Sequence, residues 1–184
     1  GPDSGRPRCW RRRSAGALGL CDAAGRHSAR ERDAQLTFDD IRAAARRIEG
    51  RVLRTPLRPS PWLSDRTSAD VRLKLETLQP TSSYKVRGAF NAVLRMAREH
   101  DGSFPKLVTA SAGNHGRALA WAARAGGMSL TAYVPEHAPR TKVEAIAASG
   151  AVLVRCRDYD EAERRAKEHA LREGAVFVSP YNDA

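Results

Sequence analysis

The sequence is poor in cysteine and in long apolar runs, and both shortages exclude classes of protein. Its three cysteines are an odd number without metal-ligand spacing, which argues against a disulfide framework and a metal site. Few cysteines also fit a reducing cytosol. Cys156 ends an apolar run typical of a protein core, whereas Cys9 and Cys21 precede the patterned part of the chain. No apolar run approaches the ~20 residues that span a membrane. We therefore expect a cytoplasmic protein with no membrane segment and no bound metal.

Lysine is scarce for so basic a chain. Only five of the 32 basic residues are lysines, and the formal net charge is +11. The arginines are spread over expected helix faces, often beside acidic residues, as in the segment 160–165. A nucleic-acid-binding protein would gather them in a stripe or carry a recognition motif, and neither occurs. Solvated helix faces explain the charge, so we expect no nucleic-acid partner; strongly salt-dependent binding would contradict this.

Hydrophobic periodicity is missing from residues 1–33, which hold eight arginines and no lysine. This composition predicts a disordered or artefactual tail. An organelle transit peptide is the weaker alternative, because the segment contains acidic residues at positions 3, 22, 31 and 33. Order is expected to begin near Thr37, where Asp40 three residues later completes a capping-box-like start.

The rest of the chain alternates between helix-like and strand-like patterns. Ile41, Ala45 and Ile48 lie on one face of an expected first helix, the segment 55–57 breaks the pattern, and a helical turn is plausible over 61–65. Strands are expected at 71–76, 107–110, 130–134, 151–156 and 176–179, and helices at 83–99, 114–124, 139–148 and 158–173. Short links between alternating elements predict a parallel α/β sheet with right-handed crossovers.

Two short segments carry residues whose chemistry points to a function. Residues 81–89 read TSSYKVRGA and place Lys85 just inside the start of a helix, behind hydroxyl residues. Residues 111–116 read SAGNHG and form a small-residue turn between a strand and a helix. A lysine amine forms a Schiff base with an aldehyde cofactor, and such a turn presents backbone N–H groups to an anion. Together the segments indicate a site for pyridoxal phosphate and an amino-acid carboxylate.

The two segments resemble the fold-type II pyridoxal-phosphate enzymes, in the branch of the threonine/serine dehydratases and serine racemase. That family's pattern is roughly S-[FY]-K-x-R-G-A, followed about twenty-five residues later by S-x-G-N-H. The resemblance extends over residues 36–184. It implies a three-layer α/β fold with a parallel sheet, like that of tryptophan synthase β. Residues 34–105 would form the N-terminal part of the large cofactor-binding domain, and residues 106–184 the small α/β domain.

The resemblance also implies roles for single residues. Lys85 would carry the cofactor and remove the α-proton of the substrate. Asn114 would hold the phenolic oxygen of the cofactor, and Tyr84 would lie against its ring. The substrate carboxylate would be held by Ser111, Gly113, Asn114 and His115. The structural alternatives are a helix cap for Asn114 and a core aromatic for Tyr84, while His115 is assigned no acid–base role.

Other positions separate branches of the resembled family. Val86 stands where cysteine-synthase-like and threonine-synthase-like members carry aspartate, and His115 where cysteine synthases carry threonine. Ala112 replaces the second serine that donates a proton in serine racemase, which favours elimination over racemisation. Ser82 stands where many members have glycine, so its backbone conformation is in question. For Arg87 a structural ion pair is expected rather than a phosphate ligand.

A complete member of the family continues past the position of Ala184, with a glycine-rich phosphate loop and a residue that faces the pyridine nitrogen. The longest glycine run here is Gly126-Gly127, so we expect a C-terminally truncated chain that is inactive alone. The full-length protein would deaminate L-threonine or L-serine to a 2-oxo acid and ammonia, as a homodimer or homotetramer. The alternatives are an inactive fragment and a serine-racemase-like activity. The sequence does not distinguish threonine, serine and 3-hydroxyaspartate as substrates.

Overall fold

The computed structural model describes residues 36–100 and 104–181, which belong to one structural unit, Leu36–Ala184. The predicted tail and the cysteines at positions 9 and 21 lie outside the described residues. No helix in the described ranges has both the length and the apolar content that crossing a membrane requires.

The first helix, α1 (Phe38–Arg47), begins as the sequence predicts. Thr37 and Asp40 form a reciprocal capping box, in which each side chain accepts a hydrogen bond from the backbone N–H of the other residue. The Thr37 hydroxyl also donates a hydrogen bond to the Asp40 carboxylate, and this bond, together with the one from the Thr37 N–H, holds the pKa of the Asp40 carboxyl below its usual value. The expected apolar face is only partly buried, since Ile48 lies in the core whereas Ile41 is exposed.

A two-stranded antiparallel hairpin follows α1. Its strands are β1 (Leu57–Pro59) and β2 (Arg72–Lys74), with the short helix α2 (Pro61–Thr67) between them. The expected strand at 71–76 is therefore confirmed but shorter, since a 3₁₀ turn begins at Glu76. The interpretation of 55–57 as a simple break missed β1. A proline within β1 is tolerated because a two-stranded ribbon leaves edge positions that need no N–H donor.

The second half of the chain forms a four-stranded parallel sheet, as expected. The elements alternate as β3 (Leu107–Ala110), α4 (Asn114–Ala125), β4 (Leu130–Pro135), α5 (Arg140–Ala148), β5 (Val152–Cys156), α6 (Tyr159–Glu173) and β6 (Val176–Phe177). The strand order is β5-β4-β3-β6, so the last strand joins the sheet beside the first. Leu107 pairs with Leu130 on one side and with Val176 on the other.

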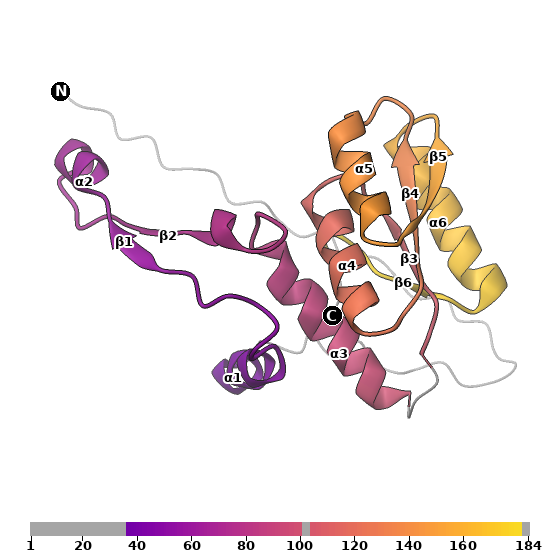
Figure 1. Ribbon diagram of the computed structural model, residues 1–184, viewed down its shortest axis with the longest axis horizontal. Coiled ribbons are helices and arrows are strands. Elements are labelled where there is room, and N and C mark those ends of the chain that lie inside the picture. The colour runs from indigo at the N-terminus through magenta and orange to yellow at the C-terminus, as the bar shows by residue number, and fades with distance from the viewer. Residues whose placement is uncertain (1–35, 101–103, 182–184) are drawn as a thin grey trace, which may run out of the picture. The chain divides into compact units, whose positions relative to one another are not determined.

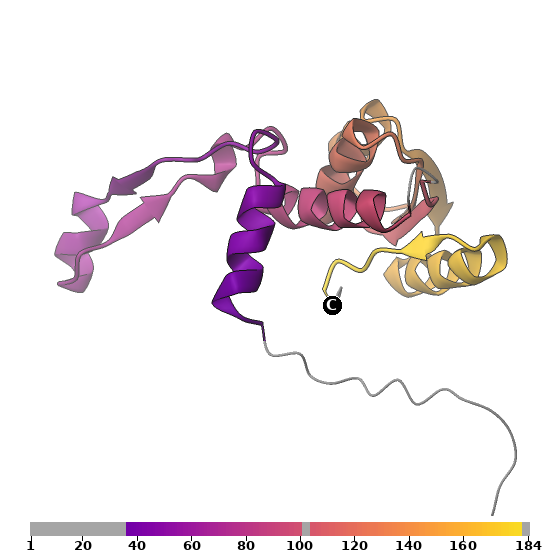
Figure 2. The same ribbon diagram turned by 90° about the horizontal axis from the view of Figure 1, so that it is seen from below.

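Helices cover both faces of this sheet, which makes three layers (Figure 1). On one face, Leu107, Ala132 and Val134 pack in a core with α4, α5 and the preceding helix α3 (Lys85–Glu99). On the other face, Val108, Tyr133 and Cys156 pack against alanines of α6. Figure 2 shows α6 on the side of the sheet away from α4. The core position expected for Cys156 is confirmed, and burial raises the pKa of its thiol.

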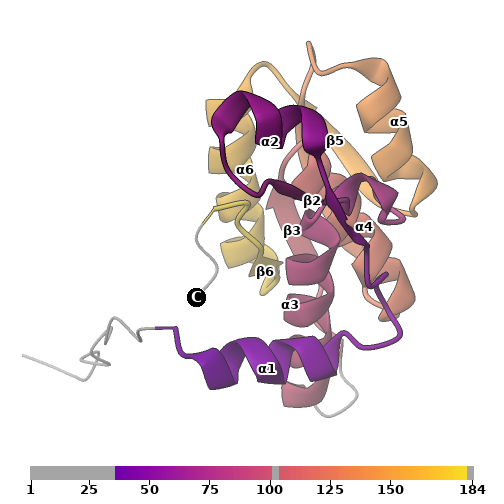
Figure 3. The same cartoon turned by 90° about the vertical axis from the view of Figure 1, so that its left-hand side faces the viewer.

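Helix α3 joins the two halves of the described chain. It packs against α4 through buried residues that include Phe90 and Val93. It also contacts α1, where Arg47 donates a hydrogen bond to Asn91, and Figure 3 shows α1 crossing α3. Lys85 is therefore the first residue of a well-buried helix.

Candidate active site

The order of the strands creates a crevice at one edge of the sheet. From β3 the chain crosses by α4 to β4 on one side, and it returns from β5 through α6 to β6 on the other. In parallel α/β sheets, ligands bind where the strand order reverses in this way, at the carboxyl ends of the strands. A cavity of about 460 Å³ lies there, lined by Ala110 and Phe177 among others. Its volume is within the ~300–1,000 Å³ usual for small-molecule sites.

Three helices begin at this cavity. Lys85, Asn114 and Tyr159 are the first helical residues of α3, α4 and α6, and all three line it. Helix N-termini carry partial positive charge and unsatisfied N–H groups. The N-cap residues of α3 and α4, Tyr84 and Gly113, make no side-chain cap, whereas Asp158 caps α6 through the N–H of Glu161. The arrangement favours an anionic group near α3 and α4.

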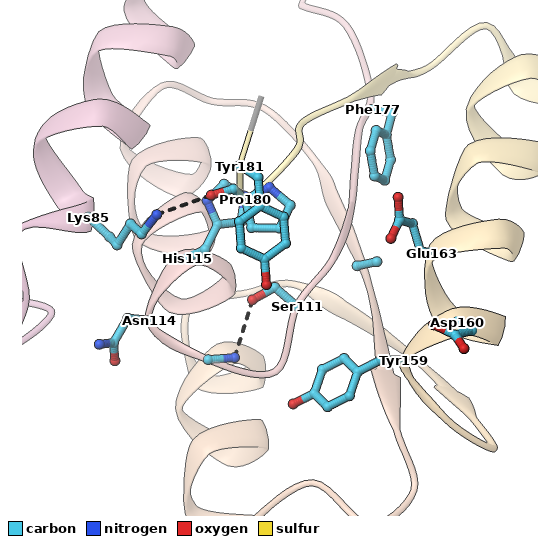
Figure 4. A pocket seen from close by; sticks show the side chains of 12 residues that line it. Lys85, Ser111, Asn114, His115, Tyr159, Asp160, Glu163, Phe177, Pro180 and Tyr181 are labelled. Carbon is cyan, nitrogen blue, oxygen red and sulfur yellow. Dashed lines mark hydrogen bonds between the residues drawn. The ribbon is translucent and has the colours of Figure 1, made fainter. Parts of the chain in front are cut away.

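Lys85 lies where the sequence predicts, half-buried at the wall of the cavity (Figure 4). Its Nζ donates a hydrogen bond to the carbonyl oxygen of Pro180 at 3.1 Å, a residue 95 positions away in the chain. The same ammonium lies 5.5 Å from the ring centre of Tyr84. Tyr84 is exposed and lines an adjacent cavity of about 370 Å³ that shares Lys85 and His115 with the first. Its expected place against a cofactor ring stays a prediction.

The backbone before Lys85 has an unusual conformation. Ser82 has φ of +57°, the left-handed region that glycine adopts without penalty. This conformation explains why many members of the resembled family have glycine at this position. Ser82 adopts the same left-handed conformation although it has a side chain. On either side, the hydroxyls of Thr81 and Ser83 are buried and have no hydrogen-bond partner among the described residues. Such groups cost about 1–3 kcal/mol each when unpaired.

The turn between β3 and α4 is held by one hydroxyl. Ser111 Oγ accepts hydrogen bonds from the N–H groups of Gly113 at 3.3 Å and Gly116 at 3.2 Å. The Ser111 hydroxyl still has its own proton to donate. The N–H groups of Asn114 and His115 lie in the first turn of α4, where the helix offers them no carbonyl. Ser111, Gly113, Asn114 and His115 all line the cavity, so the structure brings the predicted set together.

Gly116 allows this turn to close. A Cβ atom at this position would overlap the carbonyl oxygen of Ser111 and lie 3.1 Å from Cδ1 of Ile146. The space is filled by backbone, so only glycine fits without moving the turn.

Ala112 does not line the cavity. Its side chain is 1 % exposed and belongs to the core beneath the turn. Replacing it with serine would place a hydroxyl in this core, which is unfavourable without a partner. The structure therefore supplies no proton donor at position 112, and a serine there is not expected to create one at the cavity.

Arg87 forms the structural ion pair that the sequence predicts. Its guanidinium donates two hydrogen bonds to Glu76, at 2.8 and 2.9 Å, and a third to the carbonyl oxygen of Leu53. Thr55 and Gln79 also donate to the Glu76 carboxylate. The bonds from Arg87 are the main reason that the pKa of Glu76 falls from 4.5 to about 2. This network connects the hairpin and the segment before it to the start of α3.

Sequence reasoning missed the other wall of the cavity. This wall is formed by residues from α6, β6 and the segment after β6, namely Tyr159, Asp160, Glu163, Phe177, Pro180 and Tyr181. None belongs to a recognisable motif, and only the strand order brings them to the motif residues. In the described ranges no group of three histidine, cysteine or acidic side chains is placed to bind a metal.

Comparison with known proteins gives the family. A family model described as pyridoxal-phosphate dependent enzyme matches residues 48–184. The chain belongs to this family. It is 38% identical over 149 residues to an L-threonine ammonia-lyase of Thermotoga maritima, a match covering 80% of this chain and 37% of that protein. It is 36% identical to a β-hydroxyaspartate dehydratase of Paracoccus denitrificans, over 80% of this chain and 46% of that protein.

Solved structures agree with the family and with the fold class. The chain superposes on a pyridoxal 5′-phosphate-dependent aspartate racemase with a TM-score of 0.75 and 35% identity, over 81% of this chain and 46% of that one. The fold-type II class expected from the sequence is thus confirmed. The chain spans between about a third and half of the length of these relatives.

The residues of the cavity fit the cofactor of this family. An aldehyde needs a primary amine, and Lys85 is the only lysine that lines the cavity among the described residues. An anionic substrate needs N–H donors, which the first residues of α4 provide. When bound, pyridoxal phosphate supplies an electron sink for a carbanion at the α-carbon.

Proposed function

We propose that the protein containing this chain catalyses the pyridoxal-phosphate-dependent elimination of water from L-threonine or L-serine, which yields a 2-oxo acid and ammonia. The observation that carries the proposal is the shared cavity, in which the Lys85 amine and the Ser111–His115 turn face a single space. The names of relatives such as the threonine ammonia-lyase support the choice of substrate.

In this proposal Lys85 is the catalytic residue. Its amine would hold the cofactor through the aldehyde carbon, and the same amine would take the proton from the α-carbon of the substrate. Its contact with the Pro180 carbonyl holds the side chain at the cavity wall through one hydrogen bond of 3.1 Å. A single neutral acceptor contributes about 0.5–1.5 kcal/mol, or up to ~3 kcal/mol to a charged donor, so the amine can leave it.

The turn at the start of α4 binds the substrate carboxylate. Ser111 donates its hydroxyl proton, and the first-turn N–H groups of α4 add further donors with the favourable helix dipole. Gly113 has no side chain that would block the path of the substrate carboxylate to these donors. The Asn114 side chain, which is exposed to the cavity, binds the phenolic oxygen of the cofactor, and Tyr84 lies against its ring.

Elimination is favoured over racemisation because racemisation needs a second proton donor on the far face of the α-carbon. Ala112 has no proton to transfer and is buried away from the cavity. Racemase activity remains the second candidate, since an aspartate racemase has the same fold at 35% identity. Chiral chromatography of the products from L-serine separates the two: pyruvate supports elimination, and D-serine as the main product would contradict it.

The assignment of Lys85 has a direct chemical test. The protein, expressed with any sequence that its gene supplies beyond these residues, is incubated with pyridoxal phosphate, reduced with borohydride and mapped by peptide mass spectrometry. We expect the pyridoxyl group on Lys85, and the Lys85→Arg variant should lose both the label and the activity. The Lys106→Arg variant is the control and should keep both. A label on Lys74 or Lys106 would refute the assignment.

Three further expectations accompany this function. We propose that the active form is a homodimer or homotetramer, which light scattering after size exclusion would determine. The cytoplasmic location inferred from the cysteine content can be tested by cell fractionation. Residues 1–184 alone should show no useful turnover, and formation of 2-oxo acid by this chain at about 1 per second or faster would contradict that.

A further inference from the structure

The cavity has two chemically different walls. The Lys85 wall carries the amine and the turn of α4, whereas the opposite wall is formed by the N-terminal part of α6, with Tyr159, Asp160 and Glu163 (Figure 4). On the α6 wall, Asp160 and Glu163 are the charged side chains. Because both walls line one cavity, the side chain of an amino acid whose α-carboxylate is held at the turn would share this space with the α6 wall.

The charges on the α6 wall are unsuited to a second carboxylate. Glu163 accepts a hydrogen bond from Lys167 at 2.6 Å, so this lysine already has a carboxylate partner. The Lys167 ammonium also lies 5.7 Å from the ring centre of Phe177. No arginine lines the cavity among the described residues, and in the proposed function Lys85 holds the cofactor. A negative side chain would therefore meet Asp160 and Glu163 without a free cation.

An uncharged hydroxyl side chain meets favourable partners on the same wall. The Tyr159 hydroxyl and the two carboxylates can accept its proton. The Tyr159 ring is positioned by an edge-to-face contact with His137, with ring centres 5.9 Å apart. The wall thus offers hydrogen bonds to threonine or serine and repulsion to an acidic side chain.

We propose that Asp160 and Glu163 determine substrate specificity by excluding amino acids with a second carboxylate. The inference rests on the proposed function, because it concerns the substrate of the same cavity. It separates this protein from its relative named β-hydroxyaspartate dehydratase, which is 36% identical. The substrate class is then the neutral 3-hydroxy amino acids, threonine and serine, and 3-hydroxyaspartate is rejected.

The helix α6 provides a matched pair of variants. Glu163 pairs with Lys167, and Glu168 pairs with Arg164, both four residues apart along the helix. Their side chains are 54% and 55% exposed. Only Glu163 lines the cavity. Glu163→Lys and Glu168→Lys therefore each remove one intrahelical ion pair and create one like-charge pair, but only the first places a cation at the cavity.

The kinetic test compares kcat/KM for L-serine and for 3-hydroxyaspartate. In the unaltered protein we expect serine to be preferred by about a hundredfold or more. A charge-assisted hydrogen bond to the second carboxylate in Glu163→Lys should reduce this ratio by about tenfold or more. Glu168→Lys should leave the ratio within about twofold. Equal use of both substrates by the unaltered protein, or equal effects of the two variants, would overturn the inference.

A binding measurement keeps the inference testable if turnover is absent. Titration calorimetry uses 2-hydroxybutanoate and malate, two 2-hydroxy acids that differ in the second carboxylate. The unaltered protein should bind malate about tenfold or more weakly than 2-hydroxybutanoate, and Glu163→Lys should remove this difference. Loss of turnover with this binding pattern intact would refute the elimination reaction and support the exclusion. Equal binding of the two acids by the unaltered protein would refute the exclusion.

Discussion

The ion pair between Glu76 and Arg87 should make the fold sensitive to acid. Arg87 donates two hydrogen bonds to the carboxylate, which holds the pKa of Glu76 at about 2 instead of 4.5. Each pKa unit is worth ~1.4 kcal/mol, so this difference corresponds to about 3 kcal/mol of stability. The side chain of Arg87 is 32% exposed and that of Glu76 19%, so solvent screens part of the interaction. We expect Glu76→Gln to lower the free energy of unfolding by about 2 kcal/mol at pH 7.

The lowered pKa of Glu76 determines how its contribution to stability changes with pH. Glu76 has a lowered pKa in the folded protein, so its contribution is present when the unfolded chain is also deprotonated, above pH 4.5. The contribution is lost as the pH falls toward about 2, where the folded carboxyl takes up its proton. The stability difference between the unaltered protein and Glu76→Gln should therefore shrink across this interval.

Urea unfolding at several pH values measures the effect, because the midpoint changes while the slope stays constant if only stability changes. Glu144→Gln is the control, since Glu144 forms an exposed pair with Arg140 on α5. This variant should change stability by less than about 0.5 kcal/mol at every pH. A difference for Glu76→Gln that stayed constant down to pH 2, or one no larger than that of the control, would refute the reasoning.

Two glycines and one serine give further predictions for the site. Gly116→Ala should destabilise the protein by about 2 kcal/mol or more and weaken substrate binding, because its Cβ would collide with the turn at Ser111. At Gly88 an added Cβ meets nothing within 4 Å, so Gly88→Ala should stabilise α3 by about 0.5–1 kcal/mol. Thermal unfolding would measure both, and similar effects would contradict the steric argument. Ser82→Val should cost about 1–2 kcal/mol because φ is +57°, whereas Ser82→Gly should cost nothing; equal losses in urea unfolding would show that the left-handed conformation is unimportant.

Local pattern was sufficient for most elements of the fold. The capping box at Thr37 and the apolar spacing after Lys85 are short-range signals: α1 begins directly after Thr37 as predicted, and α3 begins at Lys85, two residues after the predicted start. The strand β1 was missed because it pairs with residues of β2 that lie 13 to 17 positions further along the chain, from Pro59 with Arg72 to Leu57 with Lys74. The proline within β1 also signals a break in regular structure. The proposed boundary between two domains at 105 and 106 stays a prediction.

The site residues also fall into two groups, those that local sequence predicts and those that it does not. Lys85 and the Ser111–His115 turn were found from sequence because each is a compact motif at the start of a helix. Tyr159, Asp160 and Glu163 were not found. An acidic residue in the first turn of a helix, such as Asp160, is an ordinary favourable partner of its dipole, and a glutamate such as Glu163 is ordinary on a solvated helix face. What distinguishes them is the placement of β6 beside β3, which no local pattern specifies.

The bond between Lys85 and Pro180 also constrains the order in which the protein assembles during synthesis. Lys85 leaves the ribosome 95 residues before the carbonyl group that anchors it. The strands β3, β4 and β5 can pair in sequence, but β6 must close the far side of β3 before the cavity exists. Such long-range closure is slow compared with helix formation. The reactive amine is thus made early and enclosed late, so a nascent chain presents Lys85 to free aldehydes without the specificity of the finished site.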